Sequence, residues 1–372
     1  MRVKKVCLLA VAAALACLLL SATAQARRSV PQGFFGTVLD GGLLRAPQSV
    51  QDAQWARMAT SGVESVRTVF SWAALQPNEG APPEFSATDR VVAGASAHGI
   101  EVLPVVIYAP AWARPAGSPF NAPPSDPARY AAFLTSLIGR YGPNGSFWAE
   151  HPEVAKVPLR DWQVWNEPQL RFQWNAPNYA PGYGKLLRAA HAAIKQADPG
   201  ARVVLAGATN LSWDVLEQLY RRGGIAGKFD VATIHPYTST AQRVLRAVQL
   251  FRGVMRRHGD GRLPLWVTEL GWPASKGHSK STNSLQTTPA GAAARLTRAY
   301  SDLARTRGSV RYGASRVYWY TWASSYRGDI FNFTGLYRYS GGSFKALPQL
   351  ATYRNSARLL EGCAKSTAGS CR

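Results

Sequence analysis

The chain has 372 residues, which is long enough for one large domain or two ordinary ones. It carries 43 Lys and Arg against 21 Asp and Glu, a formal net charge of +22. The basic residues are scattered along the chain and do not gather into runs, which argues against a nucleic-acid partner and favours solvated helix surfaces.

The first 26 residues have the pattern of a signal peptide that is removed on export. Residues 2–5 carry three cations, residues 7–20 are apolar, and residues 24–26 (Ala-Gln-Ala) form a small-residue cleavage site. The apolar run is too short to cross a membrane comfortably as a helix. We therefore predict cleavage after Ala26 and a secreted protein. Two alternatives remain, namely lipoprotein processing at Cys17 and an uncleaved membrane anchor.

Short apolar runs alternate with longer segments at helical spacing after residue 32. The predicted strands are 34–39, 65–70, 101–107, 162–165, 202–206, 231–234, 265–268 and 316–320. The predicted helices are 50–61, 89–98, 127–141, 179–197, 213–222, 241–258, 289–307 and 349–360. This alternation predicts a parallel sheet closed into a single (β/α)8 TIM barrel over about residues 33–360. A doubly wound open sheet is the alternative, but its glycine-rich phosphate loop is absent.

One predicted helix shows how the positive charge is expected to be distributed. Its apolar stripe consists of Val244, Val248, Phe251 and Met255. The basic residues off this stripe are Arg243, Arg246, Arg252 and Arg256. We therefore expect these arginines to form a solvated helix face.

Four cysteines are present, and two of them, Cys7 and Cys17, lie in the signal segment. The other two, Cys363 and Cys371, lie near the C-terminus without a neighbouring His. In an exported protein we expect Cys363 and Cys371 to form one disulfide that closes a short loop.

Polar and aromatic residues collect at the predicted strand ends, where the functional residues of such barrels lie. The strand ends or the residues that follow them carry Arg67, Tyr108, Trp112, Asn166, Glu167, His235, Tyr237, Glu269, Trp319 and Trp322. Two carboxyl groups facing one pocket suit the cleavage of a glycosidic bond, because one donates a proton and the other attacks the anomeric carbon or activates water. Aromatic rings suit the apolar faces of sugars, and amides and His suit the hydroxyl groups.

These residues resemble those of the clan A glycoside hydrolases. Asn166-Glu167-Pro168 follows the fourth strand and Glu269 ends the seventh, and the chain is most similar to the family 39 and family 5 type, the cellulase and β-xylosidase group. Further matching stretches are VRTVFSWAALQP, GIEVLPVVIYAPAWA, TIHPY, VTELGW and TGLYRYSGGSFKALPQLATYRN. The resemblance implies one catalytic domain in residues 27–372. It also implies a secreted retaining β-glycosidase that hydrolyses oligo- or polysaccharides without a cofactor.

The resemblance also implies residue roles. Glu167 would be the general acid/base and Glu269 the nucleophile, while Asn166 would hydrogen-bond the 2-hydroxyl group of the sugar. Arg67 would keep Glu269 ionised. The remaining substrate-binding residues would be His235, Tyr237, Tyr108 and Trp112, with Trp319 or its competitor Trp322 as the sugar platform.

Several alternatives remain open. A carbohydrate-binding barrel without turnover would share the fold, although the presence of both carboxylates argues against it. A transglycosylase would share every residue with a glycosidase. Glu269 could also be a structural acid paired with Arg67, and Glu167 could pair with Arg171. A metal hydrolase and a serine hydrolase are not expected, because the chain has no H-E-x-x-H and no G-x-S-x-G motif.

Overall fold

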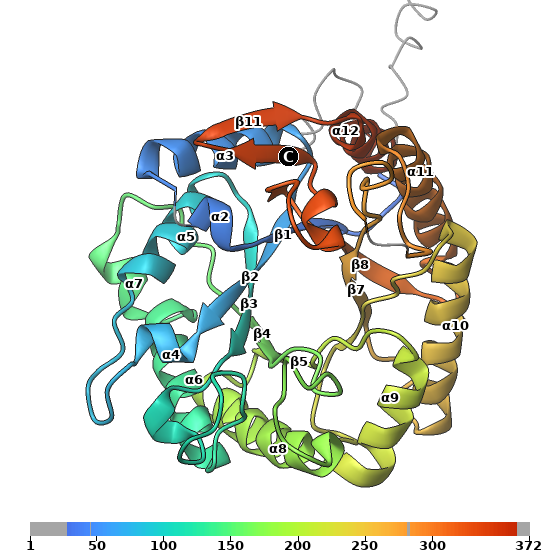
Figure 1. Ribbon diagram of the computed structural model, residues 1–372. Coiled ribbons are helices and arrows are strands. Elements are labelled where there is room, and N and C mark those ends of the chain that lie inside the picture. Colours follow the sequence, from blue (N-terminus) through green and yellow to red (C-terminus); the bar gives the residue numbers. More distant parts are fainter. Residues whose placement is uncertain (1–27, 45, 281–282, 363–372) are drawn as a thin grey trace, which may run out of the picture.

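The structure is a computed structural model that describes residues 28–44, 46–280 and 283–362. Eight parallel strands surround a central axis, with helices outside them (Figure 1). The strands are β1 (Phe35–Leu39), β2 (Ser65–Ser71), β3 (Glu101–Ile107), β4 (Asp161–Val164), β5 (Arg202–Val204), β6 (Ala232–Ile234), β7 (Leu265–Leu270) and β8 (Ala314–Trp319). A parallel bridge between Val204 and Val231 joins β5 to the start of β6 and closes the ring. The predicted TIM barrel is therefore confirmed.

A layer of long helices covers the barrel (Figure 1). It consists of α3 (Gln48–Thr60), α5 (Ser86–Ala97), α6 (Pro127–Tyr141), α8 (Tyr179–Ala197), α9 (Ser212–Gln218), α10 (Ala241–Arg257), α11 (Pro289–Thr306) and α12 (Pro348–Glu361). Local sequence fixes several helix starts. The side chain of Asp126 accepts a hydrogen bond from the backbone N–H of Ala128, and Pro127 occupies the first turn of α6. Thr240 caps α10 by accepting from the N–H of Arg243.

Shorter elements, which the strand and helix patterns did not predict, lie in the connections. They are α2 (Gly41–Leu44), α4 (Trp72–Leu75), α7 (Ser146–Glu150) and a small sheet of β9 (Ala323–Ser324), β10 (Tyr337–Ser340) and β11 (Ser343–Ala346). The small sheet follows β8 and leads into α12.

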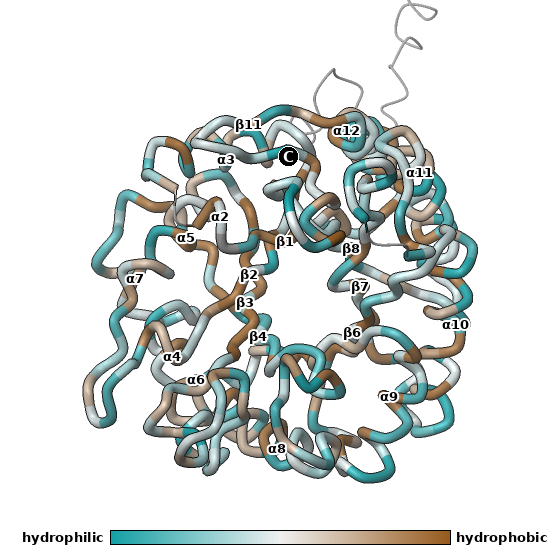
Figure 2. Tube along the Cα trace, viewed as in Figure 1, coloured by the Kyte–Doolittle hydropathy of each residue, from teal (hydrophilic) through white to brown (hydrophobic). Residues whose placement is uncertain are grey.

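The core has two layers. The inner layer fills the barrel and consists of Val38, Leu103, Val204, Val231, Trp266 and Tyr318. The outer layer lies between the strands and the helices, and it contains most of the buried apolar side chains. In Figure 2, hydrophobic residues gather along β2, β3 and β4 near the axis, and hydrophilic positions are frequent on the outer helices. The barrel is therefore packed below its mouth, and its upper end is left to position polar groups.

One prediction about α10 is wrong. Arg243, Arg246 and Arg256 are exposed as expected, but Arg252 is buried. Its guanidinium donates to the carbonyl oxygens of Gly261, Leu263 and Gly313, at 3.3, 2.6 and 3.0 Å. Burial lowers the pKa of Arg252 to about 10. Arg252 therefore connects the turn after α10 to the turn before β8 and does not form part of a solvated face.

The predictions for the signal peptide (residues 1–26) and for the Cys363–Cys371 disulfide lie outside the described residues. Within the described part of the chain, none of the helices combines the length and the apolar character needed to cross a membrane.

Candidate active site

Glu167 reaches the mouth of the barrel because the chain turns sharply after β4. Trp165 and Glu167 both have positive φ angles, of 66° and 41°. The turn is held on both sides, since the N–H of Trp165 donates to Val106 O at 3.1 Å and the N–H of Glu167 donates to Gly207 O at 3.0 Å. The side chain of Glu167 is 10% exposed. The end of the fourth strand thus delivers a nearly buried carboxyl group to the axis of the barrel.

Glu269 lies on β7 and receives hydrogen bonds on both carboxylate oxygens. Arg67 of β2 donates from Nη1 to Oε1 at 2.7 Å, and the Tyr237 hydroxyl donates to Oε2 at 2.8 Å. Arg67 also donates from Nη2 to Asn166 Oδ1 at 2.7 Å and from Nε to Gln163 Oε1 at 2.8 Å. One buried guanidinium therefore connects β2, β4 and β7 at the mouth of the barrel.

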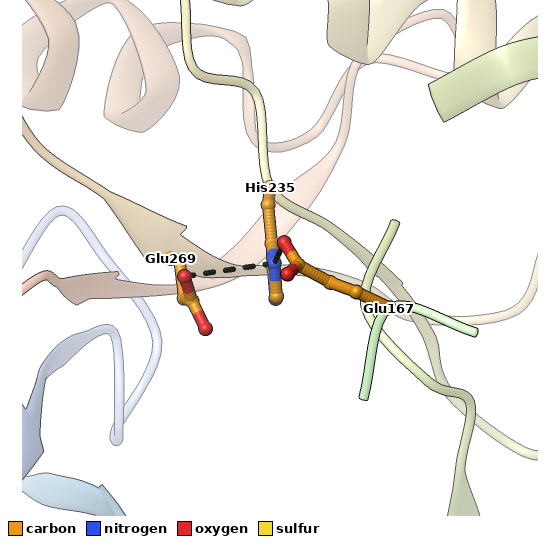
Figure 3. A group of neighbouring side chains, drawn as sticks. All are labelled: Glu167, His235 and Glu269. Atoms are coloured by element: carbon orange, nitrogen blue, oxygen red, sulfur yellow. Dashed lines mark hydrogen bonds and ion pairs between the residues drawn. The ribbon is translucent and has the colours of Figure 1, made fainter. Parts of the chain in front are cut away.

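His235, which follows β6, lies between the two glutamates (Figure 3). Its Nδ1 atom is 2.8 Å from Glu167 Oε1 and 3.6 Å from Glu269 Oε2. Its Nε2 atom is 3.0 Å from Thr268 Oγ1, and the ring is fully buried. One oxygen of each glutamate and a nitrogen of His235 all lie within 4.8 Å of one another. The structure thus brings together six of the residues named from the sequence, namely Glu167, Glu269, Asn166, Arg67, His235 and Tyr237.

The surroundings of Glu269 favour its ionised form. Burial alone would raise the pKa of this carboxyl group. Electrostatic interactions with His235 and Arg67, together with the hydrogen bonds from Tyr237 and Arg67, outweigh burial and lower the pKa of Glu269 below its usual range. In the same pair, burial and the charge of Glu269 raise the pKa of Tyr237 well above 10, so this hydroxyl remains a donor.

The donors of Glu167, His235 and Glu269 are close enough together to hold a metal ion. However, the Glu269 carboxylate already accepts from Arg67 and Tyr237, and the Arg67 guanidinium lies 2.7 Å from it. A dication would have to share this carboxylate with a fixed cation. The donor set therefore fits a hydrogen-bonded carboxyl pair better than a metal centre.

The aromatic predictions have mixed outcomes. Tyr108 is half-buried at the end of β3, with a φ of 62°. Burial raises the pKa of Tyr108, a hydrogen bond with Gln173 lowers it, and the charge of Glu167 raises it further, which places Tyr108 near Glu167. Trp112 instead donates to Gln76 O at 3.1 Å and packs edge-on against Trp72. The contacts of Trp112 therefore belong to the packing around α4.

The prediction that Trp319 or Trp322 is the sugar platform is not supported by their positions. Both indole rings are fully buried. Trp319 donates to Thr334 O at 2.9 Å, and Trp322 donates to Gln54 Oε1 at 3.1 Å. Neither ring can present a face to a sugar in this arrangement, because each is enclosed by the protein.

Tyr320 is the aromatic residue of this segment that the sequence reasoning missed. It is half-buried, and its ring centroid lies 6.4 Å from that of Tyr237 and 6.3 Å from that of Phe331. Burial first, then the charges of Asp40 and Glu269, raise its pKa well above the usual value. Tyr320 is thus the ring at the end of β8 that lies beside the glutamates.

Three further residues that hold the site were missed. Gln163 accepts from Arg67 and donates to Trp165 O at 2.9 Å, and Thr268 hydrogen-bonds His235. Gly207 lies against the imidazole so closely that a Cβ atom there would be 2.0 Å from His235 Nε2. Their positions on strands β4 and β7 and after β5 could have indicated them, but their contacts depend on the closed barrel.

Comparisons with known proteins give one family match over part of the chain and several solved structures of similar fold. A family model of glycoside hydrolase family 42, described as beta-galactosidase, matches residues 45–121. A family 39 glycoside hydrolase from Bacteroides cellulosilyticus WH2 is similar in structure, with a TM-score of 0.65 at 20% identity, over 90% of this chain and 64% of that one. No curated protein sequence matches the chain.

Two further solved structures are similar. A monomeric beta-xylosidase from Caulobacter crescentus CB15 has a TM-score of 0.63 at 16% identity, over 88% of this chain and 69% of that one. A glucosidase from Croceicoccus marinus has a TM-score of 0.59 at 15% identity, over 90% of this chain and 70% of that one. This chain thus spans about two thirds of the length of these proteins. The resemblance to clan A glycoside hydrolases that the sequence predicted is confirmed.

Proposed function

We propose that this protein is a retaining β-glycosidase that uses Glu167 as general acid/base and Glu269 as nucleophile. The observation that carries the proposal is the position of the two glutamates, whose nearest ligand oxygens lie within 4.8 Å on either side of His235. Retaining enzymes hold their carboxyl groups about 5–5.5 Å apart, whereas inverting enzymes need about 6.5–9.5 Å to admit a water molecule. The short separation supports the two-step mechanism.

In the first step, Glu269 attacks the anomeric carbon of the substrate. Arg67 and Tyr237 hold this carboxylate ionised and leave its position fixed. Glu167 transfers a proton to the oxygen of the leaving sugar as the glycosidic bond breaks. The products of this step are a free leaving group and a glycosyl ester on Glu269.

In the second step, Glu167 takes a proton from a water molecule, which attacks the anomeric carbon and releases the sugar from Glu269. His235 hydrogen-bonds Glu167 and is itself held by Thr268, so it keeps the acid/base oriented through both steps. Asn166 is held by Arg67 and is available to bind the 2-hydroxyl group of the sugar.

The substrate class follows from the same proposal. The similar proteins are described as beta-galactosidase, beta-xylosidase and glucosidase, which supports a β-linked pyranoside as substrate. We further propose that residues 27–372 form one catalytic domain that acts outside the cell after removal of residues 1–26. The support for export is the sequence pattern of those residues.

Two variants test the mechanism. Glu269→Ala should abolish turnover of every glycoside, because no nucleophile remains. Glu167→Ala should lose activity on substrates with poor leaving groups, keep the first step on activated aryl glycosides and be accelerated by azide. Activities near the wild-type level in either variant would contradict the assignment.

The stereochemistry provides an independent test of the same proposal. Proton NMR early in the hydrolysis of a β-glycoside should show the β-anomer of the sugar product before mutarotation. If the α-anomer appears first, the two-step mechanism is wrong even if both glutamates are essential.

A further inference from the structure

Three large apolar side chains are exposed on one side of the barrel mouth. Phe120 follows β3, Phe172 follows β4 and Leu211 follows β5, and these side chains are 64%, 63% and 57% exposed. Because β3, β4 and β5 are neighbours in the sheet, the residues that follow them lie on the same arc of the mouth. We call Phe120, Phe172 and Leu211 the apolar rim.

The loops that carry the two phenylalanines are bound to each other. Asn121 Nδ2 donates to Arg171 O at 3.0 Å, and the N–H of Asn175 donates to Asn121 O at 3.0 Å. Arg114 donates to Ala109 O at 2.9 Å and to Phe120 O at 3.2 Å, which closes the loop before Phe120. The rings are therefore exposed on loops that are held in place, so a ligand would meet a preformed surface.

The apolar rim lies on the Glu167 side of the site. Glu167 is at the end of β4, five residues before Phe172, and the carbonyl of Glu167 accepts from the N–H of Leu170 at 3.0 Å. The Phe120 ring centroid is 5.7 Å from that of Tyr108. Tyr108 lies near Glu167, because the charge of Glu167, after burial and a hydrogen bond with Gln173, contributes to the pKa of its hydroxyl. The acid/base is the residue that meets the leaving group, so this is the side on which the leaving group departs.

Polar groups without partners lie in the same two loops. The amide nitrogen and oxygen of Gln169 and the side-chain oxygen of Asn121 are buried and have no hydrogen-bond partner in the described structure. Buried amides in proteins are nearly always satisfied, either by the protein, by ordered water or by a ligand. A sugar ring suits both features, because its apolar faces can pack on the exposed rings and the hydroxyl groups on its edge can hydrogen-bond the amides.

We propose that the apolar rim, together with the amide of Gln169, binds the leaving-group sugar of a β-linked oligosaccharide and later binds acceptor sugars at the same place. The proposal rests on the proposed function, because it needs the glycosyl ester on Glu269. It assigns the substrate a second sugar ring next to the cleaved bond, in preference to a single sugar with a small alcohol as leaving group.

The test separates the second step from the first. The glycosyl ester is formed with 2,4-dinitrophenyl 2-deoxy-2-fluoro-β-D-glucoside, or with the xyloside or galactoside, and is detected by mass spectrometry on Glu269. After removal of excess reagent, recovery of activity is followed in buffer alone, with xylobiose or cellobiose, and with benzyl alcohol. The quantity compared is the ratio of the recovery rate with disaccharide to the rate in buffer.

In the wild type, at least one disaccharide should accelerate recovery with saturation. Phe120→Ala and Gln169→Leu should each lower the ratio about tenfold, which corresponds to ~1.4 kcal/mol. Leu359→Ala is the matched control, because Leu359 is 75% exposed on α12, and its ratio should equal that of the wild type.

Three results would overturn the proposal. The first is unchanged ratios in both Phe120→Ala and Gln169→Leu, and the second is an equal fall in the Leu359→Ala control. The third is acceleration by benzyl alcohol but not by either disaccharide, which would indicate an aryl-binding site. Each of these leaves the proposed function intact, because the ester has formed on Glu269. If the enzyme hydrolyses a β-glycoside of one of these sugars but the matching fluorosugar forms no ester on Glu269, the proposed function and the sugar-binding rim are both wrong.

Discussion

Gly207 is the position at which the structure predicts the largest effect from the smallest change. A Cβ atom at Gly207 would lie 2.0, 2.4 and 2.7 Å from three atoms of the His235 ring. The imidazole is fully buried and is held by Glu167 on one side and Thr268 on the other. Gly207→Ala therefore forces either a strained contact or a displaced ring.

The magnitude follows from these two routes. Overpacking in a well-packed interior costs about 1–3 kcal/mol. Displacement of His235 would instead break its hydrogen bond to Thr268, worth about 1 kcal/mol, and its bond to the Glu167 carboxyl group, worth about 1.5–3 kcal/mol. We therefore expect Gly207→Ala to lower the free energy of unfolding by about 1–4 kcal/mol. It should also reduce kcat/KM, because Glu167, the proposed acid/base, loses its oriented partner.

A double-mutant cycle measures this clash directly. Urea unfolding followed by tryptophan fluorescence gives the destabilisation by Gly207→Ala in the wild type and in His235→Ala, where it should fall below about 0.5 kcal/mol. Gly139→Ala in α6 is the matched control, since no atom lies within 4 Å of its Cβ position, and it should stabilise by about 0.5–1 kcal/mol. An equal cost of Gly207→Ala in both backgrounds would refute the reasoning, because the imidazole would not be the obstacle.

Two further predictions concern charge and covalent structure. Arg67 helps to lower the pKa of Glu269, and Glu269 must be ionised to act as the proposed nucleophile. Arg67→Met should therefore move the acidic limb of the kcat/KM profile to higher pH. Arg67→Lys keeps the positive charge and should move the acidic limb less. If the acidic limb lies at the same pH in the wild type and in Arg67→Met, Arg67 does not have this role. We also predict that Cys363 and Cys371 form a disulfide in the exported protein, contributing about 2–3 kcal/mol at most. Thiol labelling of the unreduced, denatured protein should modify neither cysteine, and stoichiometric labelling would contradict the disulfide.

The alternation of strands and helices was sufficient to predict the barrel. The predicted bounds 101–107, 127–141 and 179–197 agree with β3, α6 and α8. Long helices can be recognised from a single sequence because each helix buries one face against the strands, which gives its apolar residues a helical spacing. The small sheet after β8 was missed because its strands, of two to four residues, have no comparable period.

The polar residues of the site were predictable for a different reason. Arg67, Glu167 and Glu269 are charged residues on or directly after apolar strands, which is unusual unless a pocket begins there. The aromatic ring beside the glutamates was not predictable. Side chains alternate between the two faces of a strand, so a shift of one position along the strand moves a ring from the outer core to the inside of the barrel. Tyr318 belongs to the inner core and Trp319 to the outer one, so Tyr320 returns to the inside.

The contacts of Arg67 have a consequence for how the barrel is divided. Arg67 and Glu167 belong to the half-barrel β1–β4, whereas His235 and Glu269 belong to β5–β8. Each of the two proposed catalytic carboxyl groups is thus held by a guanidinium or an imidazole from the opposite half. A half-barrel that folded alone would carry one glutamate without its partner from the other half, and Glu269 would keep only its hydrogen bond from Tyr237. We expect chemical competence to arise only when the two halves dock, so that a split chain would be inert as fragments and active as a reassembled pair.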